Sequence, residues 1–290
     1  MMIEKLEGGT RMKGDVKKTL PKKPLISIIT IVYNGDKYLE CTINSVINQK
    51  YDNIEYIIID GGSKDNSIKI MQKYNDKISY WISEPDNGIY DAWNKGLAQS
   101  NGDIIGILNA DDWYNDNIFE DIVNKFLEVN EYFISFGNMQ MITDIDKKLF
   151  IKQSNFNDLK ARMSVNYPTV FLSKDIYKER IFNDTFKITG DYEFFLYLYK
   201  LSKVNNLNII NVNKVITNMR IEGVSDKLIS LIKVISEDYK ARKIHLSMYN
   251  SILYLIRDIL FKLPKKIIKY IIGYSKFNYL LEERIKNKFK

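Results

Sequence analysis

The chain has 290 residues, of which 45% are hydrophobic and 27% charged, as expected of a globular protein with a sizeable core. Its single cysteine, Cys41, excludes an intramolecular disulfide and fits a cytoplasmic location, while its single histidine, His245, argues against a histidine-based zinc site. The net charge of +7 is uneven: residues 1–23 carry +4 and residues 262–290 carry +7, which leaves −4 between them. A negative body argues against a nucleic-acid groove.

Residues 1–23 are polar and rich in lysine, and they lack the apolar segment of a secretory signal. We expect them to form a mobile basic extension. The pattern changes at Leu25, because the β-branched run 26–32 predicts a strand that is covered on both faces. A helix with apolar residues at three- and four-residue spacings follows this strand.

The same alternation of strand and helix continues along the chain. It predicts strands at 54–59, 80–82, 103–109, 133–136 and 149–151, and helices at 66–74, 91–99, after Ser173, after Gly190 and at 227–245. Strands that alternate with helices favour an α/β fold with a mixed, mostly parallel sheet flanked by helices. We expect residues 24–226 to form this domain and residues 227–290 to form a basic, helical C-terminal extension.

Ligands of parallel α/β sheets bind where the strands end, at their carboxyl edge. Four loops are therefore expected to converge there: Tyr33-Asn34, Asp60-Gly61, Glu84-Pro85-Asp86 and Asn109-Ala110-Asp111-Asp112.

Asp111 and Asp112 directly follow a buried strand, and their side chains point in different directions because side chains alternate along extended backbone. Mg²⁺ and Mn²⁺ prefer oxygen ligands, so one carboxylate can bind a cation while the other holds a ribose hydroxyl. The alternative is an ordinary turn or helix cap.

Three other segments carry polar groups suited to a nucleotide-sugar site. Asp60 can accept hydrogen bonds from a base or ribose, and Gly61 permits close approach of the backbone, unless the segment is a simple turn. Asp91, Asn94 and Lys95 share one helical face that can meet a phosphate or hydroxyl, or else only water.

The third segment is Gly190-Asp191-Tyr192, where Asp191 stands at the start of a predicted helix. A carboxylate in this position can cap the helix. Beside a sugar acceptor it can also serve as a general base.

Together these residues resemble family 2 glycosyltransferases, which have the Rossmann-like GT-A fold. The resemblance runs in order through residues 24–225, some 200 residues. Its motifs are Pro24-Leu25-Ile26-Ser27-Ile28-Ile29-Thr30, Val32-Tyr33-Asn34, Ile59-Asp60-Gly61-Gly62-Ser63, Asp65, Gly88-Ile89-Tyr90-Asp91-Ala92, Asn94-Lys95-Gly96, Leu108-Asn109-Ala110-Asp111-Asp112 and Gly190-Asp191-Tyr192.

The resemblance implies inverting transfer from a nucleoside-diphosphate sugar, usually UDP-linked, with Mn²⁺ or Mg²⁺. It implies that Asp60 contacts the nucleotide, that Asp111 and Asp112 form the metal and diphosphate element, and that Asp191 is the base. Of the acidic pair, we expect Asp112 to be the direct metal ligand and Asp111 to lie closer to the nucleotide. It also implies a base pocket lined by Thr30, Tyr33 and Asn34.

Three positions depart from the family pattern. Asn109 replaces the first aspartate of the acidic motif in many members, Tyr167 replaces a frequent histidine, and Glu222 replaces a common glycine. The metal contact is thereby left to Asp111 and Asp112.

The C-terminal extension contains two apolar stripes that are interrupted by lysines, at 252–261 and 267–272. Such basic amphipathic segments can bind an anionic membrane surface reversibly, or can pack on the catalytic domain. We expect a glycan or lipid-linked acceptor and peripheral binding at the inner face of the membrane.

Two alternatives remain open on the residues alone. A sugar-nucleotide nucleotidyltransferase also uses Mg²⁺ on a Rossmann-like half, although the loop after the first strand lacks the arginine that it needs. A protein that binds nucleotide sugars without catalysis is conceivable because of Asn109.

Overall fold

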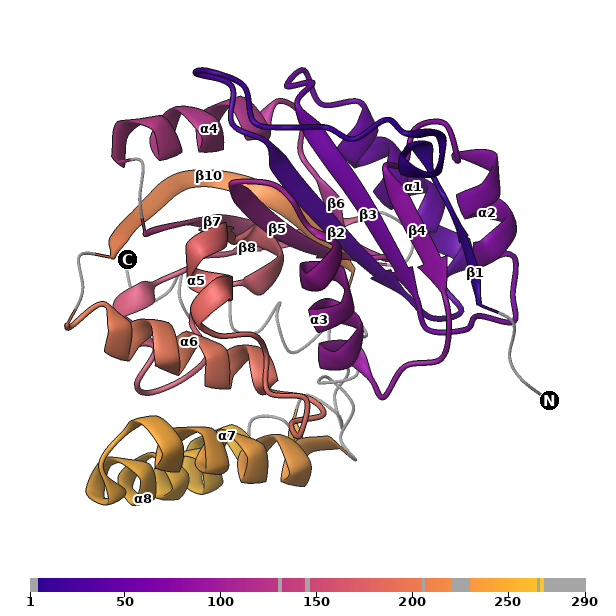
Figure 1. Cartoon of the computed structure of the whole chain (residues 1–290). Coiled ribbons are helices and arrows are strands. Elements are labelled where there is room, and N and C mark those ends of the chain that lie inside the picture. Colours follow the sequence, from indigo (N-terminus) through magenta and orange to yellow (C-terminus); the bar gives the residue numbers. More distant parts are fainter. Residues whose placement is uncertain are drawn as a thin grey trace. The chain divides into compact units, whose positions relative to one another are not determined.

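The computed structural model describes residues 5–129, 132–143, 147–204, 207–220, 230–264 and 267–268 (Figure 1). The chain divides into two compact units, residues 1–221 and 222–290. This division falls five residues before the predicted boundary at 226.

The first unit is built on a mixed sheet of ten strands (Figure 1). The strand order is β1-β4-β3-β2-β5-β9-β7-β10-β6, and β8 pairs with β7 outside this path. The bounds are β1 Leu6–Gly8, β2 Ile26–Val32, β3 Ile54–Asp60, β4 Tyr80–Ser83, β5 Ile104–Asn109, β6 Trp113–Tyr114, β7 Phe133–Ile142, β8 Lys148–Lys152, β9 Phe171–Ser173 and β10 Asn208–Arg220.

The four strands β4, β3, β2 and β5 form a parallel core, as predicted. Strand β9 joins β5 in the antiparallel sense, and β10 is parallel to β7. The expected α/β architecture with a mixed sheet is therefore confirmed. The predicted strands and helices before residue 110 all form, with ends that shift by at most two residues.

Helices cover the sheet because alternate side chains of its strands face opposite sides. Ile26, Ile28 and Val32 of β2 share one buried cluster with side chains of α1 (Asp36–Ile47), α2 (Ser67–Lys73) and α4 (Ile118–Val129). Ile29 faces α3 (Ile89–Gln99) instead, since a Cβ on Gly96 of α3 would meet its side chain. Both faces of the parallel core are thus buried, which explains its continuous hydrophobic sequence.

Residues 5–23 do not form the mobile extension that was predicted. Strand β1 pairs with the edge of β4, and a 3₁₀ helix, η1 (Thr10–Lys13), follows it. Arg11 forms an ion pair with the buried carboxylate of Glu55. The physical reason is that an edge strand offers unpaired backbone groups, and a buried carboxylate needs a cation; neither is visible in the local sequence.

The rest of the first unit carries the remaining helices. These are η2 (Phe156–Asp158), η3 (Tyr167–Thr169), α5 (Lys174–Glu179) and α6 (Gly190–Leu201). Helices α5 and α6 agree with the prediction of helices after Ser173 and Gly190.

The second unit contains α7 (Leu231–His245), α8 (Met248–Arg257) and a π-helical turn, η6 (Asp258–Lys262). The buried guanidinium of Arg242 on α7 is 2.8 Å from a carboxylate oxygen of Asp258 and ties α7 to the start of η6. Within the described residues, no helix has the length and hydrophobicity needed to span a bilayer. The second predicted stripe lies mostly outside the described residues.

Candidate active site at the carboxyl edge of the sheet

The parallel strands end level with one another. Their register pairs Asp60 with Ser83 on one side and with Val32 on the other, and pairs Ile31 with Asn109. The loops that follow these strands therefore leave the sheet at one edge. This is the arrangement that the strand-end argument predicts.

Contacts between these loops show that they converge. The backbone N–H of Asn34 donates to Ser63 Oγ at 2.7 Å, which joins the loops after β2 and β3. A Cβ on Gly61 would clash with the Asp86 carboxylate, so the loops after β3 and β4 also touch. A Cβ on Gly35 would lie 3.4 Å from the Cβ of Ala110, which brings in the loop after β5.

The Asp60 carboxylate is buried and holds the loop after β3 in shape. It accepts hydrogen bonds from the backbone N–H groups of Gly62 and Ser63 and from the hydroxyls of Ser63 and Ser83. These four donors satisfy the carboxylate without a ligand. The predicted contact between Asp60 and a nucleotide stays a prediction, and it requires that some of these bonds be exchanged.

Thr30 is also buried, and its hydroxyl accepts a hydrogen bond from Tyr56 at 3.1 Å. This corrects the expectation that Thr30 lines the base pocket, because the residue lies within the strand, two positions before its end. Tyr33 is 65% exposed at the strand end, where its ring is accessible to a base. Asn34 has a φ of 51° and caps the backbone N–H of Lys64 with its side-chain oxygen.

The acidic pair differs in exposure. Asp111 is exposed, while Asp112 is only 1% exposed. One oxygen of Asp112, Oδ2, accepts a long hydrogen bond of 3.4 Å from Asn109, whereas the buried Oδ1 has no hydrogen-bond partner. The amide oxygen of Asn109 is likewise buried and unpartnered. Two unsatisfied buried oxygens next to an exposed carboxylate are suited to a cation.

Partial removal from water affects the ionisation of both carboxyl groups, and most strongly that of the buried Asp112. Desolvation raises the pKa of Asp112 well above its ordinary value, and the negative charge of Asp111 raises it further. Desolvation also raises the pKa of Asp111, although the positive charge of Arg220 opposes this. Of the two carboxyl groups, Asp112 is therefore the one whose ionised form is disfavoured more strongly by burial.

The polar side chains on the predicted ligand-binding face of α3 already have partners within the protein. The amide of Asn94 exchanges two hydrogen bonds with the backbone of Phe182, at 2.9 and 3.0 Å. Both polar atoms of Asn94 thereby fix the segment that precedes α6, and a contact between Asn94 and a ligand stays a prediction. Lys95 binds Glu84 and the Pro85 carbonyl, both at 2.8 Å.

Asp91 accepts a hydrogen bond from the backbone N–H of Asn87 at 2.8 Å, and it lies 3.8 Å from Lys95. Its carboxylate thereby closes the loop between β4 and α3. A contact between Asp91 or Lys95 and a donor phosphate remains a prediction.

Asp191 lies in the first turn of α6, half-buried. Its Oδ1 accepts from the Tyr90 hydroxyl at 3.2 Å and from the backbone N–H of Tyr192 at 2.9 Å. A Cβ on Gly190 would lie 2.7 Å from the Tyr90 ring, so glycine is needed for this approach. Tyr90 belongs to α3, which starts at the carboxyl edge of the sheet, and it therefore links Asp191 to that edge.

Two of the departures from the family pattern acquire a structural explanation. Asn109 supplies a neutral partner to Asp112. Tyr167 is buried, stacks on Trp93 with ring centroids 4.5 Å apart, and shares a hydrogen bond of 2.8 Å with the hydroxyl of Tyr177. Its ring packs on Trp93, whose ring in turn contacts that of Tyr90. Glu222 lies outside the described residues.

The structure brings three further residues to this edge: Asp86, which the strand-end argument placed there without a role, and Tyr90 and Arg220, to which the sequence gave no role. Asp86 touches the loop after β3, and desolvation raises the pKa of its carboxyl. Its position after β4 was a sufficient signal. For Tyr90 and Arg220 the sequence gives no local signal, because their partners are distant along the chain.

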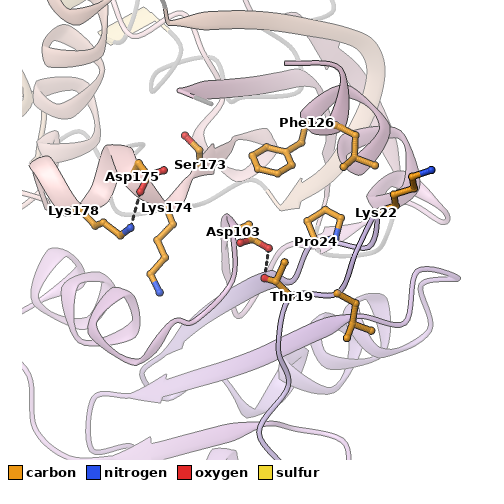
Figure 2. Close-up of a pocket in the computed structure, with 11 residues that line it drawn as sticks. Thr19, Lys22, Pro24, Asp103, Phe126, Ser173, Lys174, Asp175 and Lys178 are labelled. Atoms are coloured by element: carbon orange, nitrogen blue, oxygen red, sulfur yellow. Dashed lines mark hydrogen bonds and ion pairs between the residues drawn. The ribbon is translucent and has the colours of Figure 1, made fainter. Parts of the chain in front are cut away.

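A cavity of about 300 Å³ lies elsewhere in the first unit (Figure 2). Pro24 and Asp103 line it from the positions that precede β2 and β5, so it is at the opposite ends of these strands. Figure 2 shows Asp175 paired with Lys178, and Thr19 hydrogen-bonded to Asp103. Because Asp111, Asp112 and Asp191 do not line this cavity, we do not assign the site to it.

Within the described residues, no group of three or more His, Cys, Asp or Glu side chains is arranged to hold a metal ion. The oxygens of Asp111 and Asp112 nevertheless fit a cation that takes its remaining ligands from water and a diphosphate, as Mg²⁺ does in many phosphate sites. The unpartnered Oδ1 of Asp112 is the observation that supports this fit.

Comparison with known proteins gives a consistent result. The family described as Glycosyl transferase family 2 matches residues 27–197. An uncharacterised glycosyltransferase of Rickettsia typhi is 29% identical over 193 residues, which cover 62% of this chain and 60% of the relative. One of Rickettsia conorii is 31% identical over 197 residues, covering 62% of this chain and 32% of the relative. The matches thus span about a third to three fifths of these relatives.

Among solved structures, S. aureus TarS (residues 1–349) in complex with UDP-GlcNAc aligns with a TM-score of 0.60 and 17% identity, over 83% of this chain and 72% of that one. The same protein with UDP aligns with a TM-score of 0.57 and 19% identity, over 80% and 69%. At this identity the likeness establishes the shared fold.

Proposed function

Because the chain belongs to glycosyl transferase family 2, we propose that it moves a sugar from a nucleoside-diphosphate donor to an acceptor hydroxyl with inversion at the anomeric carbon. The observation that carries this proposal is the acidic pair: Asp111 is exposed, and Asp112 is buried with an unpartnered oxygen, at the carboxyl edge of the parallel strands. Asp191 is tied to the same edge through Tyr90.

A UDP-linked donor is supported by the structural neighbour, since TarS was crystallised with UDP and with UDP-GlcNAc. In this chain Tyr33 is the accessible aromatic side chain for the base. The loop that Asp60 holds places the backbone of Gly61 beside Asp86. We propose that these loops take up the nucleotide and that Asp111 faces its ribose and diphosphate.

In the proposed reaction the acceptor oxygen forms a bond to the anomeric carbon as the bond from that carbon to the diphosphate oxygen breaks. The diphosphate leaves with the bonding electron pair. Asp191 accepts the proton of the acceptor hydroxyl. Its carboxylate is oriented for this by the Tyr90 hydroxyl and by the backbone N–H of Tyr192.

Asp112 and Asp111 would hold Mn²⁺ or Mg²⁺. When bound, the ion neutralises charge on the departing diphosphate. The chain's own contribution is to keep Oδ1 of Asp112 and the amide oxygen of Asn109 buried and without a hydrogen-bond partner, so that they favour a cation over water.

Product analysis tests the proposal. We expect the protein to release free nucleoside diphosphate slowly when it is incubated with Mn²⁺ and a panel of UDP- and GDP-sugars, because water can replace the acceptor. Release of pyrophosphate would instead identify a nucleotidyltransferase. Binding without any release, even in the presence of glycan acceptors, would identify a non-catalytic nucleotide-sugar-binding protein.

We further propose that the acceptor is a glycan or lipid-linked, as in surface polysaccharide assembly, and that the C-terminal unit binds an anionic membrane surface at the cytoplasmic face. Helix α8 presents exposed apolar side chains at three- and four-residue spacings: Tyr249, Ile252, Leu253 and Ile256. The following residues 262–290 carry +7. An apolar stripe beside a strongly basic segment is complementary to anionic lipid.

Flotation of the full-length protein with lipid vesicles tests this attachment. We expect it to float with vesicles that contain phosphatidylglycerol and not with phosphatidylcholine alone. Replacing Ile252, Leu253 and Ile256 by Ser should abolish flotation, whereas Ile151→Ser, an exposed apolar residue of the first unit, should not. Equal flotation of the triple variant would remove α8 from the proposal.

A further inference from the structure

Arg220 is the last residue of β10, and its side chain is buried although it is charged. The residue is only 7% exposed. Its guanidinium carbon lies 4.0 Å from the centroid of the Tyr38 ring and 4.7 Å from that of the Trp113 ring. Two aromatic side chains therefore hold the guanidinium, and cation–π contacts of this kind are stronger when they are desolvated.

The sheet register places this guanidinium beside the acidic pair. In the antiparallel pairing of β10 with β6, Thr217 lies opposite Tyr114 and Asn218 opposite Trp113. Arg220 lies two residues beyond Asn218, at the end of β10. The guanidinium of Arg220 packs on the ring of Trp113, the residue that directly follows Asp112 in the chain.

The charge balance at this edge points to a role for the cation. Two ionised carboxylates alone would repel a nucleoside diphosphate, and Asn109 adds no further charge. A guanidinium presents its N–H groups in a planar fork that matches two phosphate oxygens. The rings of Tyr38 and Trp113 fix the plane of the guanidinium. The Arg220 side chain therefore loses less conformational entropy when a phosphate binds.

We propose that Arg220 is a diphosphate-recognition residue of the donor site and acts beside the metal-binding carboxylates. This inference rests on the proposed function, since it concerns the same nucleoside-diphosphate donor. It adds a residue from β10, far along the chain from the acidic pair, and assigns it the phosphate groups and not the base or the sugar.

Calorimetric titration with a nucleoside diphosphate and its parent nucleoside tests this role. UDP, GDP and dTDP are first titrated into wild-type protein with Mn²⁺, and the best ligand is used with its matching nucleoside. Arg220→Met is expected to weaken diphosphate binding by about 10- to 100-fold, the value of a charged hydrogen bond, and to leave nucleoside binding unchanged. Arg220→Lys should lose less, because it keeps the charge but not the fork.

Lys125→Met is the matched control, since it removes one positive charge from the exposed surface of α4, where Lys125 pairs with Glu128. It should bind both ligands as the wild type does. Equal losses for diphosphate and nucleoside, or no loss for either, would overturn the role of Arg220. If the wild type binds none of the diphosphates, the proposed function itself fails, which is a separate result.

A measurement on the wild type alone guards against a variant that does not fold. In EDTA, the proposal requires the diphosphate to bind at least as tightly as the nucleoside, because Arg220 offsets the repulsion from Asp111 and Asp112. Weaker binding of the diphosphate under these conditions would contradict it.

Discussion

Replacement of Asp191 by Asn is expected to lower the turnover of sugar transfer by about 10²- to 10⁴-fold, the usual contribution of a general base. Nucleotide binding should not change, because the loops that we propose to take up the donor are other ones. Asn has the same shape as Asp and can still accept the hydrogen bonds from the Tyr90 hydroxyl and the Tyr192 backbone. The loss would therefore report the missing proton acceptor and not a displaced helix. The measurement is kcat beside the dissociation constant of the nucleoside diphosphate.

Two further variants separate chemistry from structure. Asp184→Asn changes an exposed carboxylate in the segment that precedes α6 and should leave kcat unaltered. Tyr90→Phe removes the hydroxyl that orients Asp191 and should cost about 10-fold in kcat, the value of one hydrogen bond. Retention of wild-type turnover by Asp191→Asn would exclude the residue from the role of base.

The parallel core was predictable because its elements are encoded locally. Its strands β2, β3 and β5 are short runs rich in isoleucine, and β2, β3 and β4 are each followed directly by a helix. Strand β10 gave no such signal, since its buried and exposed residues alternate irregularly and it pairs with β7, some 70 residues earlier. Strand β1 is only three residues long, and the edge of β4 determines its pairing.

The position of Asp111 and Asp112 was predictable from the strand end alone. Which of the other polar groups already have hydrogen-bond partners within the protein was not. Asn94 is bound by the backbone of Phe182, which is 88 residues away, and the sequence offers no sign of that contact. Asp60 and Thr30 were assigned to the ligand by position, whereas burial gives each of them protein partners. Position along a strand predicts an edge of the sheet. It does not predict which polar atoms are already satisfied there.

Asp112→Asn is expected to stabilise the metal-free protein and at the same time to abolish metal-dependent transfer. Burial raises the pKa of Asp112, so the folded chain binds this proton more tightly than the unfolded chain. Above the raised pKa the buried charge costs stability, and the cost disappears as the pH falls through that pKa. The wild type should therefore gain stability on mild acidification, while the Asn variant lacks this gain.

At alkaline pH in EDTA the variant should be more stable by about 1 kcal/mol or more, since a charged oxygen without a partner costs at least this much, and its Tm should rise by about 2–4 °C per kcal/mol. Asp116→Asn, at an exposed position four residues further on, should change neither Tm nor transfer. The measurements are thermal unfolding with and without Mn²⁺ and the nucleoside diphosphate, and release of that diphosphate from the donor.

These two effects separate a metal ligand from a structural carboxylate. If a carboxylate stabilises the fold, neutralising it makes the protein less stable. If it serves as a cation ligand, its buried charge destabilises the protein as long as no cation is bound. Ligand binding stabilises the folded state in proportion to the logarithm of its concentration over its dissociation constant. Mn²⁺ with nucleoside diphosphate should thus raise the Tm of the wild type above that of Asp112→Asn. A variant that is less stable in EDTA, or that Mn²⁺ stabilises equally, would show that Asp112 serves the fold and that the cation is bound by other groups.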